Sequence, residues 1–285
     1  MELNQKTIKK KLIFEGIGLH SGELVKISLL PAAEDEGIEF IRTDLKKNSA
    51  IKAIWENIYP ANLCTKIINT KGIGVSTVEH LMFSFYSLGI TNLTIEINGP
   101  EVPIMDGSAK KFIEDILKTG LLLQEKKKKS LQILEPIEIH DQNRFIKYEL
   151  TNKNCLQIDY TINYKDQFIK KQRYILKNAN KNYSEIFNCR TFCHQEDLEK
   201  IFAMGLAKGG SLDNAIVISG DRVLNQDGLR HKDEFVRHKI LDCLGDLYLS
   251  NFFINGKITC NQGGHELTAS LLKEIFKNTK NYLIE

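Results

Sequence analysis

The order of strand-like and helical runs constrains the fold of this chain more than any other feature. Strand-like runs lie at 25–30, 93–97, 131–139, 144–150, 155–164, 214–218 and 252–260. Helical runs lie at 76–88, 108–119, 195–206, 231–250 and 265–277. Strands grouped ahead of helices, twice along the chain, favour the α+β class over a doubly wound parallel sheet. We therefore predict two similar α+β domains, at 1–125 and 131–285.

A charge run separates the two predicted domains. Residues 124–130 contain four consecutive lysines and show no apolar period. Such a run is typical of a solvated linker, although a binding patch is the alternative. We predict a linker near 124–130.

Composition narrows the class of protein. The 285 residues are 42% hydrophobic and 26% charged, as in soluble globular proteins, and the net charge of only +3 argues against a nucleic-acid partner. No apolar stretch approaches the ~18 residues needed to span a bilayer, and the first residues lack the apolar core of a signal peptide. The six cysteines form no Cys-x-x-Cys pair, so we expect reduced, buried thiols in a cytoplasmic protein.

The run 231–250 predicts a helix with two distinct faces. One face is an apolar stripe of Val236, Ile240, Cys243 and Leu247. On the other face His238 and Asp242 are four residues apart, close enough to share one metal ion, and Asp246 continues that face. The alternative is a polar pair on an exposed face. Gly245 costs about 1 kcal/mol inside a helix, which suggests close approach to a ligand or a second helix.

Three other residues are candidates for the same site. His80 is the candidate for a third ligand, and Glu79 beside it fits a general base. The pattern Ser76-x-x-Glu79 also matches a capping box, so both roles for Glu79 stay open. His265 begins a helix, where its pKa is depressed, and the Asp246 carboxylate can restore its basicity.

Several sequence blocks carry a resemblance to a known family. They are Gly-Ile-Gly-Leu-His-Ser-Gly at 16–22, Val-Ser-Thr-Val-Glu-His-Leu-Met at 75–82, Glu-Val-Pro-Ile-Met-Asp-Gly-Ser-Ala at 101–109, Cys-Arg-Thr-Phe at 189–192, Gly-Leu-Arg at 228–230, Glu-Phe-Val-Arg-His-Lys at 234–239 and Gly-His at 264–265. In this order and over nearly the whole chain, they resemble the UDP-3-O-acyl-N-acetylglucosamine deacetylase of lipid A biosynthesis.

The resemblance implies a zinc-dependent deacetylase. The metal, one Zn²⁺ per chain, would have a fourth position open to water, and the same ligand set also accepts Fe²⁺. Glu79 would be the general base, and His265 the acid or the cation that helps the amine leave, with Asp246 orienting His265. Thr191 would hydrogen-bond the oxyanion. The implied metal ligands are His80, His238 and Asp242.

The resemblance also implies a substrate and a fold. The acetamide of an acylated UDP-sugar would be hydrolysed to the amine and acetate, the committed step of lipid A synthesis. Lys239 would lie near the diphosphate, Phe192 on the glucosamine ring and Tyr164 on the uracil, and Arg144 would replace a lysine near the phosphates. The helices of two α+β domains would be sandwiched between two outer sheets. We expect a monomer that contacts the membrane surface only transiently.

Two departures from the family keep alternatives open. Cys193-His194 replaces the usual Gly-Phe, and Gln262-Gly263 replaces Lys-Ser. A zinc amidohydrolase acting on another acyl-amine is therefore a second hypothesis. A non-catalytic sugar-nucleotide binder is a third, against which the complete catalytic set argues. Apolar residues within 192–215 are candidates for an acyl groove, although an amphipathic core helix explains them equally well.

Overall fold

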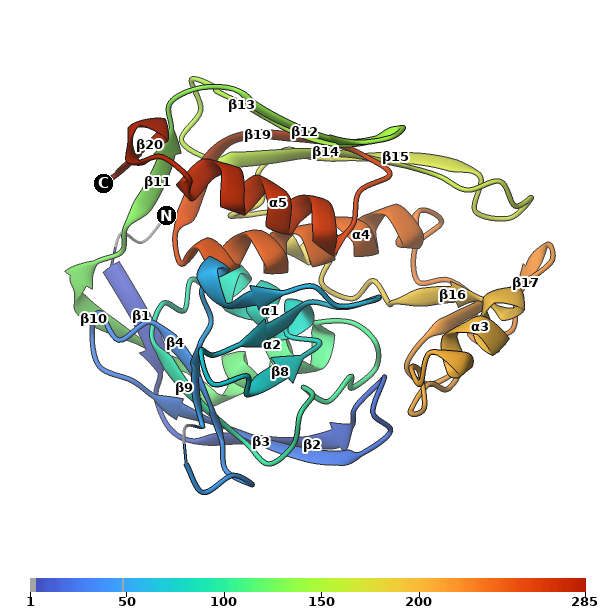
Figure 1. Cartoon of the computed structure of the whole chain (residues 1–285), viewed down its shortest axis with the longest axis horizontal. Helices are drawn as coiled ribbons and strands as arrows, with labels where there is room; N and C mark the ends of the chain where they lie inside the picture. The colour runs from blue at the N-terminus through green and yellow to red at the C-terminus, as the bar shows by residue number, and fades with distance from the viewer. Residues whose placement is uncertain (1–3, 48) are drawn as a thin grey trace.

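In the computed structural model, which describes residues 4–47 and 49–285, helices lie between two outer sheets (Figure 1). This confirms the predicted α+β class and its sandwich of layers. The helices are α1 (Glu79–Leu88), α2 (Lys110–Thr119), α3 (Leu198–Ala203), α4 (Glu234–Leu247) and α5 (His265–Phe276). Short 3-10 turns occur at Trp55–Asn57, Tyr183–Glu185, Gln195–Asp197, Tyr248–Ser250 and Thr279–Asn281.

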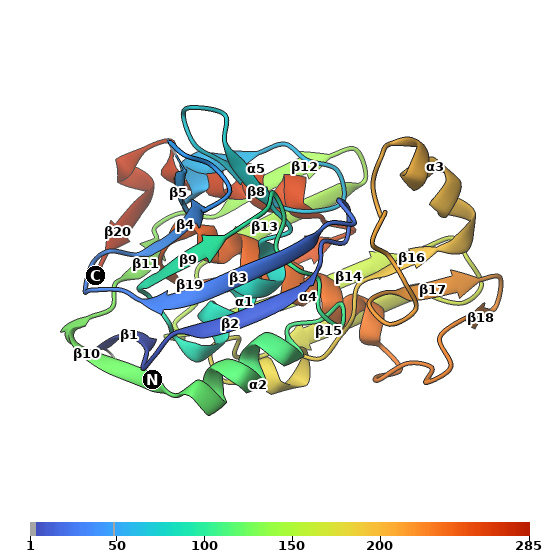
Figure 2. The same ribbon diagram turned by 90° about the horizontal axis from the view of Figure 1, so that it is seen from below.

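The lower sheet comes from the first part of the chain and has the strand order β2-β3-β9-β4-β5 (Figure 2). Its strands are β2 (Leu12–Ile17), β3 (Leu24–Pro31), β9 (Leu93–Ile97), β4 (Ile38–Arg42) and β5 (Ala50–Lys52). Along β9, Leu93, Ile95 and Ile97 are buried while the residues between them are partly exposed. This alternation turns one face of the sheet toward the helices.

The upper sheet comes from the second part of the chain. Its central strand, β19, pairs antiparallel with β13 and parallel with β14 and β11. The strands are β11 (Ser130–Ile133), β12 (Ile137–Asp141), β13 (Arg144–Glu149), β14 (Leu156–Asn163), β15 (Lys171–Leu176), β19 (Phe253–Asn261) and β20 (Tyr282–Ile284). β15, which sequence reasoning missed, pairs with β14.

Helices α1 and α4 cross at the centre of the molecule, and Gly245 makes their close approach possible. A Cβ atom at Gly245 would lie 2.0 Å from the carbonyl oxygen of Glu79. Of the two explanations for this glycine, the second helix is therefore the one that the structure supports. His238, Asp242 and Asp246 are all buried, so the second face of α4 is not exposed.

A smaller unit projects from one side of the sandwich (Figures 1 and 2). It contains α3 and the sheet β16-β17-β18, with β16 (Phe192–His194), β17 (Ile216–Ser219) and β18 (Arg222–Val223). The predicted helix at 195–206 is wrong in extent, because its first turn is a 3-10 turn and α3 ends at Ala203.

Two local predictions are corrected by the structure. The helix predicted from Ser76 begins at Glu79, because Ser76 ends strand β8 (Gly74–Ser76), which pairs with β7 (Lys66–Ile68). Ser76 therefore does not cap α1. The run at 124–130 is not wholly irregular, since strand β10 (Leu121–Lys127) pairs with β1 (Asn4–Ile8). The division into two domains near this run stays a prediction.

Strand β6 (Ile58–Tyr59) joins the small β7-β8 hairpin.

Of the cysteines, Cys155 and Cys193 are partly exposed, the other four are buried, and all six are free thiols. Within 4–47 and 49–285, no helix combines the length and the apolar character that crossing a bilayer requires.

Candidate active site

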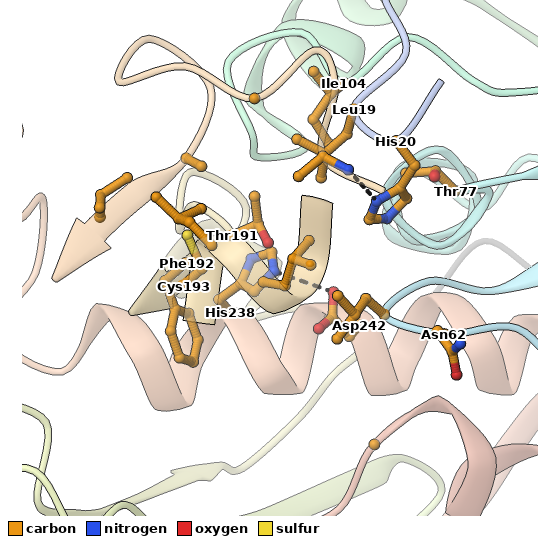
Figure 3. Close-up of a pocket in the computed structure, with 18 of the residues that line it drawn as sticks. Leu19, His20, Asn62, Thr77, Ile104, Thr191, Phe192, Cys193, His238 and Asp242 are labelled. Atoms are coloured by element: carbon orange, nitrogen blue, oxygen red, sulfur yellow. Dashed lines mark hydrogen bonds and ion pairs between the residues drawn. The ribbon is translucent and has the colours of Figure 1, made fainter. Parts of the chain in front are cut away.

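The three predicted metal ligands meet where α1 crosses α4. The Nε2 atoms of His80 and His238 lie 3.4 Å and 3.3 Å from Oδ1 of Asp242. The ligand atoms of the three residues all lie within 4.8 Å of one another, and all three residues are buried. Figure 3 shows His238 and Asp242 side by side on α4.

The chemistry of these donors fits a catalytic divalent metal. Burial lowers the pKa of His238 to about 4, so its imidazole is neutral. Nδ1 of His238 donates to the carbonyl oxygen of Cys189 at 3.0 Å, which leaves the Nε2 lone pair directed at the site. Two imidazole nitrogens and one carboxylate suit zinc or iron.

Asp242 is held as a carboxylate by its neighbours. Burial acts to raise the pKa of its carboxyl, but His238 and Lys239 hold that pKa well below its usual range. The ammonium of Lys239 donates to Oδ2 of Asp242 at 2.6 Å. Oδ1 therefore remains directed at the two histidines. Lys239, expected near the diphosphate, also lines the cavity described below.

Glu79 is the first residue of α1 and lies directly before His80. The residue is 3% exposed, and its Oε2 accepts a hydrogen bond of 3.0 Å from the backbone N–H of Thr65. Burial raises the pKa of Glu79 to about 7. A carboxylate with this pKa can accept a proton near neutral pH.

His265 is the first residue of α5 and pairs with Asp246 of α4. Its Nδ1 lies 2.8 Å from Oδ2 of Asp246, and its Nε2 lies 4.0 Å from Oε1 of Glu79. Burial acts to lower the pKa of His265, but the Asp246 carboxylate raises it to about 9. The imidazole is therefore protonated at neutral pH despite its place at a helix N-terminus.

Thr65 is a site residue that sequence reasoning missed. Its hydroxyl lies between Asp246 and His265, and its backbone N–H contacts Glu79. No periodicity or spacing in the sequence distinguishes this threonine, which lies 181 residues from Asp246.

The segment that carries Thr191 and Phe192 is held by a buried ion pair. The backbone N–H and the guanidinium of Arg190 both donate to Glu234, the first residue of α4. The N–H of Thr191 donates to the carbonyl oxygen of Gly107 at 2.8 Å. In Figure 3, Thr191 lies beside the ring of His238. The ring of Phe192 meets that of His238 edge-on at 6.2 Å.

A cavity of about 680 Å³ opens onto these groups. Its polar part includes Glu79, His80, His238, Asp242 and His265, and its walls also include Thr191 and Phe192. The apolar part includes Ile201, Phe202, Met204, Leu212 and Val217. Several residues of the segment predicted to form an acyl groove thus line one cavity with the candidate metal site.

The remaining predicted substrate residues, Tyr164 and Arg144, also line this cavity. The ring of Tyr164 meets that of Phe192 edge-on at 5.8 Å. Arg144 forms ion pairs with Asp141 and, at 3.5 Å, with Glu266. Both predicted residues line the cavity, and Arg144 already has carboxylate partners there.

One family departure also lines the cavity. Cys193 is a wall residue, and its neighbour His194 lies 3.3 Å from Oδ2 of Asp166. The ring of His194 is also 5.6 Å from that of Tyr164. The departure therefore changes the chemistry around the predicted sugar and uracil contacts.

A strained residue helps to shape the other wall. Thr77 has φ of +58°, which is rare for a β-branched residue. Its hydroxyl donates to Glu101 at 2.8 Å, and Glu101 also accepts the backbone N–H groups of His20 and Ser21. Glu101 thereby ties the 16–22 block to the segment that leads into α1.

Comparison with known proteins gives the same match over almost the whole chain. The family model described as UDP-3-O-acyl N-acetylglycosamine deacetylase matches residues 5–277. A Haemophilus ducreyi protein named UDP-3-O-acyl-N-acetylglucosamine deacetylase is 42% identical over 279 residues, which cover 97% of this chain and 91% of the relative. Proteins of the same name from Haemophilus influenzae and Pasteurella multocida are 40% and 39% identical, with the same coverage.

Proposed function

Because the chain belongs to the UDP-3-O-acyl N-acetylglycosamine deacetylase family, we propose that it hydrolyses the acetamide of UDP-3-O-acyl-N-acetylglucosamine, with zinc as cofactor. The products are the free amine and acetate, and the step belongs to lipid A synthesis. The observation that carries the proposal is the cluster of His80, His238 and Asp242, which lines one cavity with a candidate base, Glu79, and a candidate acid, His265.

His80, His238 and Asp242 would hold the metal, and Fe²⁺ suits the same donors. When bound, the metal polarises the acetamide carbonyl and lowers the pKa of a water molecule. Lys239 neutralises the second oxygen of Asp242 and keeps that carboxylate in one orientation.

Glu79 and His265 divide the proton transfers. Glu79 takes a proton from the attacking water, whose oxygen forms the new bond to the carbonyl carbon. His265 then gives its Nε2 proton to the leaving nitrogen as the C–N bond breaks. Asp246 stabilises the imidazolium before transfer and orients its ring. A pKa of about 7 for Glu79 and about 9 for His265 places both groups in the required states near neutral pH.

The remaining cavity residues would bind the substrate. Thr191 hydrogen-bonds the oxyanion that develops on the carbonyl oxygen. Phe192 packs on the glucosamine ring and Tyr164 on the uracil, because flat aromatic rings bind such faces. Lys239 and Arg144 lie near the phosphates. Arg144 must then exchange one of its carboxylate partners for phosphate.

The apolar part of the cavity would hold the acyl chain. Ile201, Phe202 and Met204 line it, and a hydrocarbon chain gains free energy by leaving water for such walls. A substrate with this tail also implies transient contact with the membrane surface. Cytoplasmic location and a monomeric state remain predictions, which cell fractionation and analytical ultracentrifugation can test.

The test is acetate release from the acylated UDP-sugar by purified protein. We expect turnover to stop after chelation and to return when about one equivalent of zinc is added. A substrate without the uridine diphosphate should be hydrolysed poorly.

Two outcomes would contradict the proposal. Equal turnover with and without the nucleotide would favour an amidohydrolase that acts on a different acyl-amine. Cys193, which departs from the family pattern and lines the cavity, is the observation behind this alternative. Binding of the nucleotide sugar without zinc and without acetate release would favour a binding protein.

A further inference from the structure

Thr65 contacts the candidate base as well as the candidate acid. It lies directly before β7 and is 4% exposed. Its backbone N–H donates to Oε2 of Glu79 at 3.0 Å, while its Oγ1 lies 2.5 Å from Oδ1 of Asp246 and 3.0 Å from Nδ1 of His265. A single buried residue therefore touches the base, the acid and the partner of the acid.

The donors and acceptors assign the direction of these hydrogen bonds. A threonine hydroxyl has one proton to donate and lone pairs to accept, whereas a carboxylate only accepts. The hydroxyl of Thr65 therefore donates to Oδ1 of Asp246, and its lone pairs face the Nδ1–H of His265. That N–H donates to Oδ2 of Asp246 at 2.8 Å. Both oxygens of the carboxylate are thus occupied, which fixes its plane.

Fixing this carboxylate also fixes the ring of His265. With Nδ1 directed at Asp246, Nε2 points toward Glu79, whose Oε1 is 4.0 Å away. The position of Glu79 is set from the same residue, through the peptide N–H of Thr65. The backbone on the other side of Thr65 is held as well, because the N–H of Val78 donates to the carbonyl oxygen of Thr65 at 3.3 Å.

We propose that Thr65 is a positioning residue that sets the geometry of the acid relative to the base. Its backbone holds Glu79, and its hydroxyl holds Asp246 and, through it, His265. The inference rests on the proposed function, because it gives Thr65 a part in that reaction. The hydroxyl is the part that substitution can remove, while the backbone contact to Glu79 stays.

The experiment compares Thr65→Val, which removes the hydroxyl but keeps the shape, with Thr65→Ser, which keeps the hydroxyl. Without the hydroxyl, Asp246 and the ring of His265 lose the contact that orients them, so we expect kcat of Thr65→Val to fall about 10- to 100-fold. KM and zinc content should stay near those of the wild type. Thr65→Ser should keep kcat within about threefold, because the donor to Asp246 remains. If Thr65→Val does not fold, Thr65→Ala carries the same test.

Two further measurements separate positioning from a merely structural role. In an Asp246→Asn background, Thr65→Val should lower kcat little further, because both substitutions break the same hydrogen-bond network. In the metal-free protein, the ¹⁵N–¹H signal of His265 Nδ1 should move in Thr65→Val and return in Thr65→Ser.

The matched control is Thr7→Val, which removes the buried hydroxyl of Thr7 in β1. That hydroxyl accepts a hydrogen bond from the N–H of Ala32 and contacts none of the candidate catalytic residues. It should lower stability but leave kcat unchanged. A wild-type kcat in Thr65→Val, full additivity with Asp246→Asn, or an unmoved His265 signal would overturn the inference. A wild-type protein that releases no acetate would instead overturn the proposed function.

Discussion

At the scale of single residues, the proposed chemistry depends first on Glu79. Replacing it by glutamine removes the proton acceptor but keeps the shape of the side chain. We expect kcat to fall by about 10²- to 10⁴-fold, the usual contribution of a general base. Bound zinc should stay near one equivalent, because Glu79 is not among the three clustered donors.

The control for this prediction is Glu23→Gln, which changes an exposed glutamate and should leave kcat unaltered. Loss of the metal from Glu79→Gln would contradict the assignment and make Glu79 a ligand or a support for the ligands. Metal analysis of both purified variants beside the acetate assay decides between these outcomes.

The second residue-scale prediction concerns pH and Asp246. His265 acts as an acid only while protonated, and the Asp246 carboxylate raises its pKa to about 9. Activity should therefore persist up to about pH 9 and fall as the pH rises through that value. In Asp246→Asn the pKa of His265 should fall, because this carboxylate no longer opposes the effect of burial, so the alkaline limb of the kcat profile should move to lower pH and the maximal kcat should drop.

Asp221→Asn, at an exposed turn, is the matched control and should not move the alkaline limb. An Asp246→Asn profile that keeps its limb near pH 9 would show that another group carries the titration.

At the scale of elements, the crossing of α1 and α4 decides whether the ligands meet. A glycine-to-alanine change inside a helix ordinarily stabilises it by about 1 kcal/mol. Gly245→Ala should do the opposite, because the new Cβ would lie 2.0 Å from the backbone oxygen of Glu79. We expect the free energy of unfolding to fall by about 1–3 kcal/mol or more. Zinc binding should also weaken, because a shift of Glu79 would displace His80, the next residue of α1.

Gly220→Ala provides the comparison, because its turn has open space around the new methyl group and a φ of +63°. Its cost should be about 1–2 kcal/mol of backbone strain, without loss of zinc or activity. Denaturant unfolding and metal titration of the two variants test the prediction, which fails if Gly245→Ala unfolds and binds zinc like the wild type.

The same two helices explain where pattern reasoning was incomplete. The two-faced helix at 231–250 correctly placed His238 and Asp242 on one side, because a spacing of four residues always does so in an α-helix. Periodicity did not reveal that this side is buried as well. From the sequence pattern, a polar helix face is expected to be exposed to solvent. Here α1 covers that face of α4.

At the scale of the whole molecule, the candidate metal site joins segments from both halves of the chain. His80 comes from α1, while His238 and Asp242 come from α4, which packs under the upper sheet. A metal that binds only this folded arrangement stabilises it by mass action. At a free metal concentration of 100 times Kd the gain is about 2.7 kcal/mol. Chelation should therefore lower Tm by several degrees, and zinc should restore it.

The matched variant for this prediction is His80→Ala, whose Tm should respond much less to chelator or to zinc. Calorimetry with and without the chelator provides the measurement. Equal responses of the wild type and the variant would mean that the stabilising metal binds elsewhere.

The sequence by itself determined much at this scale. The order of strands and helices indicated the α+β class, and the motif blocks indicated the family, since both depend on residue types at fixed positions along the chain. The layered sandwich was implied by that resemblance. Local signals were less reliable at boundaries: Ser76 ends a strand, and part of 124–130 is a strand, because pairing with distant partners overrides local propensity.

Only the tertiary structure decided how the site residues are held. The pairing of Lys239 with Asp242 and the place of Thr65 between Glu79, Asp246 and His265 follow from helix packing and strand pairing. The hydrogen bond from Thr65 to Asp246 joins residues 181 positions apart. A sequence records which donors and acceptors are available, but their distances depend on how the elements pack. The residues that cluster as candidate ligands were therefore predictable from the chain, whereas the geometry that orients the proposed acid and base was not.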